Sequence, residues 1–187
     1  MTRDVVHAGR DTLSSEMRHA VLLPPCVLSP GLQAERKSGP HWGYPFVELI
    51  MGHDVNSVFM PCPESSFGGF GNGLQRGRHG IDYYKGVEGY GDHCLRLAKE
   101  SAEMILDMQA GGFRFLCILG IEHSPTCAVS YMYSHNGMLK RAGMFYEALQ
   151  CELEANGMRI PWIGINRTHP KKALKALEMR LSGDRFC

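Results

Sequence analysis

Three cysteines stand at the ends of short apolar stretches, and each has a proline or a threonine beside it. These are Cys26, Cys62 and Cys127. An apolar stretch of this length that stops in polar residues is typical of a strand buried on both faces. In an open parallel sheet, ligands bind at the carboxyl ends of the strands. If the three stretches are parallel strands of one sheet, the three thiols meet in one pocket.

Thiolates are soft ligands that suit iron–sulfur clusters, zinc or copper(I). The sequence lacks the close Cys-x-x-Cys pairs that are typical of structural zinc ribbons. Three cysteines without an obvious fourth would suit a four-iron cluster in which one iron stays open and acts as a Lewis acid. Zinc held by three cysteines and a water is the alternative. Residue types alone do not separate the two.

The other cysteines have a simpler interpretation. Cys94, Cys117 and Cys151 fall in apolar helical or strand patterns, where a free cysteine serves as a small buried side chain. Cys187 is the last residue. Because the total of 7 is odd and the spacing is irregular, we do not expect a disulfide framework. Clustered cysteines without disulfides indicate a reducing, cytoplasmic location.

Size and charge exclude several classes of partner. The chain has 187 residues and a formal net charge of +1, without a block of lysines and arginines. Long-range attraction to nucleic acid or to an anionic membrane is therefore not expected. We see no signal peptide, and no apolar stretch is long enough to span a bilayer. These features indicate one domain, as a monomer or homodimer, that acts on a small molecule.

Alternating strands and helices predict the α/β class, with a mainly parallel sheet flanked by helices in a Rossmann-like three-layer sandwich. Pro161 fits poorly in a central strand and indicates an edge or a bulge. The expected strands are 19–23, 57–60, 113–121 and 159–165. The expected helices are 45–51, 91–109, 140–156 and 169–181.

Three other segments are expected to be irregular. Residues 1–17 are polar and predict an exposed arm or a short helix, and residues 29–44 predict a loop over the pocket. Residues 63–90 contain the most glycine-rich part of the chain and are interpreted as a lid loop. No Walker-type Lys-Ser/Thr follows these glycines, so a nucleotide site is weakly supported.

The motifs around the three cysteines resemble the thiouracil desulfidase family. Its members show an early Cys-Leu-Leu-Gly, a Cys-Pro-Glu and a Ser-Pro-Ser-Cys. This chain has Cys26, then Cys62-Pro-Glu64, and later Ser124-Pro-Thr-Cys127, in the same order. The resemblance runs from about Val21 to Ile165. The ligand motifs match better than the substrate-facing loops, which indicates a divergent relative acting on another thio-compound.

The resemblance implies that Cys26, Cys62 and Cys127 hold a [4Fe–4S] cluster whose fourth iron takes the sulfur of a thiocarbonyl substrate. It also implies catalytic roles for Glu64 and Ser124. On residue types alone, Glu64 would be a salt-bridged loop residue and Ser124 a turn or helix cap. A non-catalytic iron–sulfur or sulfur carrier and a cysteine-ligated zinc enzyme remain as alternative functions.

A few further residues could serve the same site. His123 could contact the substrate, although a loop histidine with protein partners is the simpler interpretation. Tyr83 and Tyr84 could stack on a base, but packing of the lid is simpler. The remaining candidates are loop residues that could complete a zinc site or bind an anion: His41, His53, His79, Arg76 and Arg78.

Overall fold

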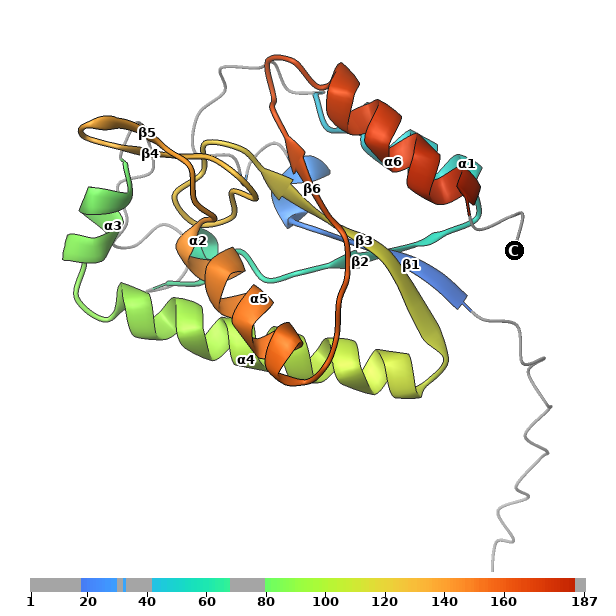
Figure 1. Ribbon diagram of the computed structural model, residues 1–187, viewed down its shortest axis with the longest axis horizontal. Coiled ribbons are helices and arrows are strands. Elements are labelled where there is room, and N and C mark those ends of the chain that lie inside the picture. Colours follow the sequence, from blue (N-terminus) through green and yellow to red (C-terminus); the bar gives the residue numbers. More distant parts are fainter. Residues whose placement is uncertain (1–17, 30–31, 33–41, 68–79, 184–187) are drawn as a thin grey trace, which may run out of the picture.

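The computed structural model describes residues 18–29, 32, 42–67 and 80–183 of the chain (Figure 1). The predicted arm 1–17 and part of both predicted loops lie outside these residues.

The centre of the fold is a four-stranded sheet in which every neighbouring pair is parallel. Its strands are β1 (Arg18–Leu23), β2 (Asn56–Phe59), β3 (Phe113–Ile121) and β6 (Trp162–Ile165), in the order β2-β1-β3-β6. Strands β1 and β3 lie inside the sheet, which explains why their sequences are almost continuously apolar. The predicted α/β class with a parallel sheet is confirmed.

Strand β6 occupies an edge of the sheet, as Pro161 indicated. The proline comes directly before β6 and lacks a backbone N–H, so it could not donate to a second neighbour. Its carbonyl oxygen still accepts a hydrogen bond from the backbone N–H of Ile118, at 2.8 Å.

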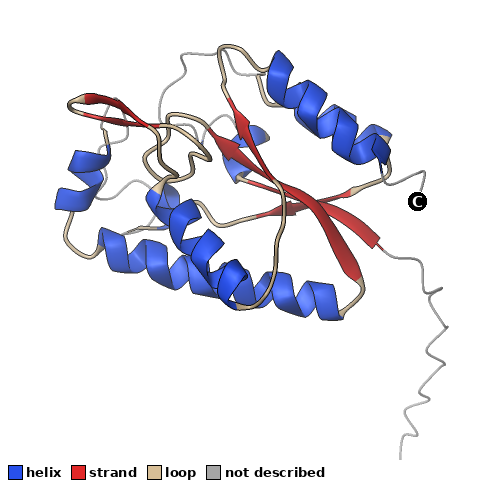
Figure 2. Ribbon diagram, viewed as in Figure 1, coloured by secondary structure: helices blue, strands red, loops and turns tan. Residues whose placement is uncertain are grey.

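Helices cover both faces of the sheet and complete three layers (Figure 2). On one face, α4 (Tyr90–Ala110) and α5 (Met144–Ala155) pack against alternate strand residues such as Leu22. On the other face, α1 (Tyr44–Gly52) and α6 (Lys171–Gly183) pack against residues such as Leu23. Because successive strand side chains point to opposite faces, one apolar strand supplies both layers of the core.

The carboxyl ends of three strands lie at the same end of the sheet, and each strand leads there into a short segment. Strand β1 is followed by a 3₁₀ turn, η1 (Pro25–Val27), and β2 is followed by the one-turn helix α2 (Pro63–Ser66). Strand β3 leads into the loop 122–131. Cys26 lies in η1, Cys62 directly precedes α2 and Cys127 lies in the loop 122–131, so the topology brings the three cysteines to the same end of the sheet.

The structure corrects the prediction of a lid loop over residues 63–90. This segment contains α2 at its start and α3 (Ile81–Gly86) near its end, while residues 68–79 lie outside the described part. The buried side chains of Ile81 and Tyr84 give α3 an inward face that a glycine-rich composition conceals.

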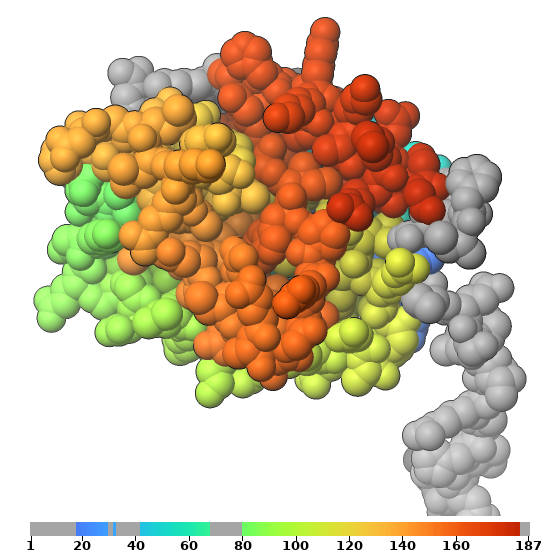
Figure 3. Space-filling model, viewed as in Figure 1, coloured from blue at the N-terminus to red at the C-terminus, as the bar shows by residue number. Residues whose placement is uncertain are grey.

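A hairpin that the sequence did not indicate lies beside α3. Its strands are β4 (Met132–Ser134) and β5 (Gly137–Leu139). In the space-filling view, this hairpin and α5 form a continuous part of one face of the molecule (Figure 3). The helix predicted from residue 140 begins only at Met144, because residues 140–143 connect the hairpin to α5. No helix in the described part of the chain is long and apolar enough to cross a membrane.

Candidate functional site

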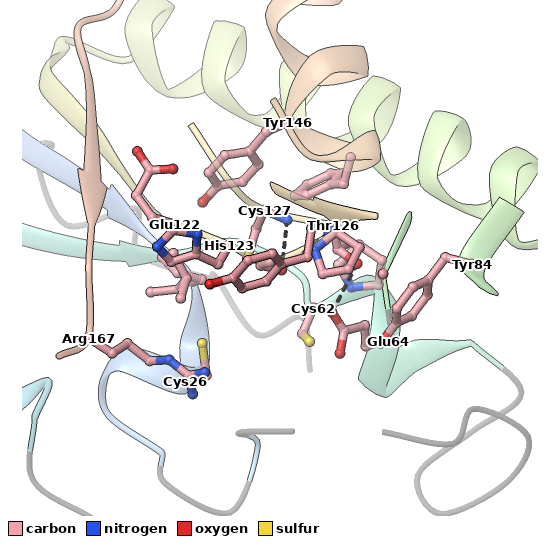
Figure 4. A pocket seen from close by; sticks show the side chains of 18 of the residues that line it. Cys26, Cys62, Glu64, Tyr84, Glu122, His123, Thr126, Cys127, Tyr146 and Arg167 are labelled. Carbon is pink, nitrogen blue, oxygen red and sulfur yellow. Dashed lines mark hydrogen bonds between the residues drawn. The ribbon is translucent and has the colours of Figure 1, made fainter. Parts of the chain in front are cut away.

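A cavity of about 810 Å³ lies at the carboxyl ends of the parallel strands, and Cys26, Cys62 and Cys127 all line it (Figure 4). Glu64 and Ser124 line the same cavity. The structure therefore brings together all five site residues that the sequence analysis named. None of the described cysteines forms a disulfide, so the three sulfurs are present as thiol groups.

Prolines and a serine fix the first two cysteines. Pro24 and Pro25 force β1 to end and turn into η1, which holds Cys26 at the cavity. Cys62 is the residue before Pro63, and it occupies the N-cap position of α2 with an extended backbone. The hydroxyl of Ser65 donates a hydrogen bond to the sulfur of Cys62 over 3.3 Å.

The third cysteine lies in a tight turn built around Ser124. The hydroxyl oxygen of Ser124 accepts hydrogen bonds from the backbone N–H groups of Thr126 and Cys127, both at 3.2 Å. The Cys127 thiol also donates to this oxygen, at 3.3 Å. These contacts are those of a serine that shapes a turn. The catalytic role that the family resemblance implies for Ser124 stays a prediction.

Burial and mutual repulsion oppose ionisation of two of the thiols. Burial raises the pKa of Cys26 well above its usual range, and negative charge at Cys127, Cys62 and Glu64 raises it further, while Arg167 lowers it. Burial likewise raises the pKa of Cys127 to about 12, against the lowering effect of the Ser124 hydrogen bond. Without an added positive charge, these two groups are neutral thiols at pH 7, which does not suit a nucleophilic cysteine.

The thiols do not form a ready site for one metal ion. Within the described ranges, no three His, Cys, Asp or Glu side chains lie close enough together to hold a single ion. Zinc needs every ligand at about 2.0–2.3 Å from one centre. A four-iron cluster binds each thiolate through a different iron, so its ligands can stand farther apart around one cavity.

Glu64 is hydrogen-bonded to the loop that carries Cys127. Its carboxylate oxygen Oε1 accepts a hydrogen bond from the hydroxyl of Thr126, at 2.9 Å. The Thr126 hydroxyl oxygen also lies 2.9 Å from the phenol oxygen of Tyr90. Both Thr126 and Tyr90 are almost completely buried. Glu64 is therefore held from the loop after β3, although it belongs to the segment after β2.

His123 has a conformation that the sequence did not predict. Its φ angle is +71°, in the left-handed region that non-glycine residues rarely adopt, and its backbone N–H donates to Tyr131 at 2.7 Å. Its ring stacks on Tyr133 at 4.9 Å between centroids, beside the cavity. The Nδ1 atom is buried and has no hydrogen-bond partner among the described residues. The interpretation of His123 as a loop histidine satisfied by protein partners is therefore wrong for this nitrogen.

Arg167 is a cavity residue that the sequence analysis missed. It follows the carboxyl end of β6, and its positive charge lowers the pKa of Cys26 (Figure 4). The adjacent Asn166 accepts hydrogen bonds at Oδ1 from the backbone N–H and the hydroxyl of Thr168, which closes the turn around Arg167. The signal was available, because Arg167 follows a strand end as the three cysteines do.

The remaining candidates have mostly structural environments. Tyr84 is almost fully buried, so the predicted packing is confirmed, although Tyr83 and Tyr84 both line the cavity. His53 does not line the cavity, and its Nδ1 lies 2.9 Å from the carbonyl oxygen of Leu49. The other proposed loop residues lie outside the described part of the chain: His41, His79, Arg76 and Arg78.

Cys94 and Cys117 are buried as expected. The expectation for Cys151 is wrong, because it lies on the exposed side of α5. The apolar pattern around Cys151 belongs to neighbouring positions such as Leu149 and Leu153, which face the core.

The chain has no match among protein-family models, curated proteins or solved structures.

Proposed function

We propose that this protein is a non-redox desulfidase that removes sulfur from a small thiocarbonyl compound and that Cys26, Cys62 and Cys127 hold a [4Fe–4S] cluster. The observation that carries the proposal is the convergence of these thiols, from three separate strand ends, on one cavity that also contains Glu64. Buried cysteines that only fill space would be spread through the core, as Cys94 and Cys117 are.

The chemistry of the thiols supports a metal cluster. Burial and mutual repulsion keep Cys26 and Cys127 protonated, and they raise the pKa of both groups. A bound cluster contributes positive charge that favours thiolates, so the three residues become ligands together.

When bound, the cluster would present an open iron to the sulfur of the substrate and polarise the carbon–sulfur bond. In the overall reaction, the oxygen of water bonds to the thiocarbonyl carbon, the carbon–sulfur bond breaks, and sulfur leaves as hydrogen sulfide. Both protons of the water end on the sulfur, and no electrons are gained or lost.

Glu64 is the residue of this chain that is suited to move the proton. As a carboxylate, it accepts a proton from the attacking water and returns it to the leaving sulfur. The hydrogen bond from the Thr126 hydroxyl holds this carboxylate at the cavity.

The rest of the cavity suits a small, flat substrate. Its volume of about 810 Å³ lies in the usual range for small-molecule sites. The stacked rings of His123 and Tyr133 both line the cavity, and Arg167 contributes positive charge near Cys26. This charge offsets part of the negative charge of the thiolates and of the sulfide that leaves.

The direct test is sulfide release by protein purified without oxygen. A panel of thiopyrimidines and thioamides is offered, and hydrogen sulfide and the oxygenated product are both measured. We expect equal amounts of the two from at least one compound. A cluster-containing protein that releases no sulfide from any compound would instead be a sulfur or cluster carrier, and an active zinc protein would be a different enzyme.

A further inference from the structure

We infer that Thr126 is a positioning residue that holds Glu64 in its working orientation and that Tyr90 in turn holds Thr126. This inference rests on the proposed function only for its kinetic consequence. The hydrogen-bonded chain itself is a feature of the fold, from the buried phenol of Tyr90 through Thr126 to the carboxylate of Glu64.

The direction of both hydrogen bonds in the series from Tyr90 through Thr126 to Glu64 is fixed. The hydroxyl of Thr126 has one hydrogen, and it donates that hydrogen to Oε1 of Glu64. Its contact with Tyr90 at 2.9 Å must therefore be one in which Thr126 accepts and the phenol donates. A hydroxyl that accepts from a phenol is polarised toward its own acceptor, so the two bonds strengthen each other.

Glu64 needs such a partner because its own segment is short. It lies in α2, which spans only Pro63–Ser66, and a glutamate side chain has several rotatable bonds. Thr126 comes from the loop after β3, next to Cys127. This hydrogen bond links the carboxylate to the loop that carries one of the three thiols.

Tyr90, at the inner end of the hydrogen-bonded series, is held rigidly. Tyr90 has no exposed surface, and its ring lies edge-on to that of Phe67 at 5.3 Å and beside that of Tyr84 at 5.2 Å. The phenol lies at the start of α4, the longest helix in the described part of the chain, and it cannot move without disturbing the core. Thr126 therefore receives its hydrogen bond from a fixed point, which is what the orientation of a catalytic carboxylate requires.

Three variants separate positioning from simple packing. Thr126→Val keeps the shape of the side chain and removes the hydroxyl, and Thr126→Ser keeps the hydroxyl. Tyr90→Phe removes the inner donor and leaves the ring in place. Tyr146→Phe is the matched control, since it removes another buried phenol, one that donates to the carbonyl oxygen of Leu119 at 2.6 Å and not to Thr126.

Crystal structures of these variants test the inference without any substrate. We expect Glu64 to keep one side-chain conformation in wild type, Thr126→Ser and Tyr146→Phe. In Thr126→Val it should turn away or occupy several conformations, and Tyr90→Phe should have the same effect to a smaller extent. An unchanged Glu64 in Thr126→Val would overturn the inference, whether or not the protein proves to be a desulfidase.

Kinetics give the second measurement once a substrate is known. Thr126→Val should lower kcat about 10- to 100-fold, with KM and iron content within about twofold of wild type. Thr126→Ser should restore kcat to within about threefold. Loss of iron in Thr126→Val would show that Thr126 shapes the loop that holds Cys127 and does not position Glu64. A wild-type kcat in this variant would also contradict the inference. If wild type has no activity, the proposed function fails while the crystal structures still decide this inference.

Discussion

The hydroxyl oxygen of Ser124 lies 3.2 Å from the backbone nitrogen of Cys127 and 3.3 Å from its sulfur. One side chain therefore fixes both the backbone and the thiol of a proposed ligand. This relationship gives Ser124 a role in building the site, in addition to the catalytic role that the family resemblance implies.

Ser124→Ala tests the building role. Two backbone N–H groups lose their acceptor, and leaving such groups unsatisfied costs roughly 1–3 kcal/mol. We expect lower stability in urea and less iron per chain. Ser101→Ala is the control, because its buried hydroxyl has no hydrogen-bond partner among the described residues. A Ser124→Ala protein with normal stability and iron but no turnover would show that catalysis is the main role of Ser124.

The three proposed ligands should be individually necessary for the cluster. Replacing Cys26, Cys62 or Cys127 with serine removes one of three thiolates, and no other described cysteine lines the cavity, so we expect less than about half of the wild-type iron. Iron and acid-labile sulfide in protein purified without oxygen measure the effect.

The same measurement on other cysteines provides the controls. Cys94→Ser, Cys117→Ser and Cys151→Ser should keep the wild-type iron content, since none of these residues lines the cavity. If one of these variants loses its iron while remaining folded, the proposed ligand set is incorrect.

Glu64→Gln should retain iron and lose turnover. The amide has nearly the shape of the carboxylate but cannot accept a proton, and the loss of a general base typically lowers the rate by about 100-fold or more. Glu147→Gln is the control, because this exposed carboxylate pairs with Arg141 outside the cavity. Full sulfide release by Glu64→Gln would remove Glu64 from the mechanism.

Stability should fall in alkaline solution, in part because of Cys117. Burial raises the pKa of this thiol to about 12, despite the opposing charge of Arg180. In the unfolded chain the thiol ionises near its ordinary value of about 8.5, so above that pH the unfolded state gains stability until the folded thiol also ionises near pH 12. The expected loss is about 1 kcal/mol per pH unit over this window.

Urea unfolding at pH 8 and pH 10 checks this effect. Wild type should lose more stability over the interval than Cys117→Val, whose side chain does not titrate. An equal loss in both proteins would mean that other groups account for the alkaline instability.

Much of the fold could be predicted from local patterns. The interior strands β1 and β3 are largely apolar stretches, and α4 ends at Ala110, one residue after the predicted end at 109. The elements that the sequence analysis did not predict are short. The hairpin β4–β5 has strands of three residues, and its contacts with the loop after β3 cannot be read from periodicity.

One boundary shows how packing overrides a local pattern. Gly143 lies against the backbone of Thr126, so close that a side chain there would collide with it. Gly143 itself has an extended backbone, and α5 begins at the next residue, Met144. Helical periodicity gave no sign of this contact, because it joins segments that are distant in the sequence.

The site residues that directly follow the end of a strand could be predicted from the sequence. Cys26, Cys62 and Cys127 were found by that rule, and Arg167 obeys it as well. The link from Tyr90 through Thr126 to Glu64 was not predictable, since it joins the helices α4 and α2 through the loop after β3. The unusual backbone of His123 was also hidden, because a left-handed conformation at a histidine has no sequence signal.

The most direct test of this account is the metal content of wild-type protein purified without oxygen. We expect a brown protein with about four irons and about four acid-labile sulfides per chain. A colourless, folded and soluble protein that contains one zinc, or that takes up no iron and sulfide on anaerobic reconstitution, would contradict it.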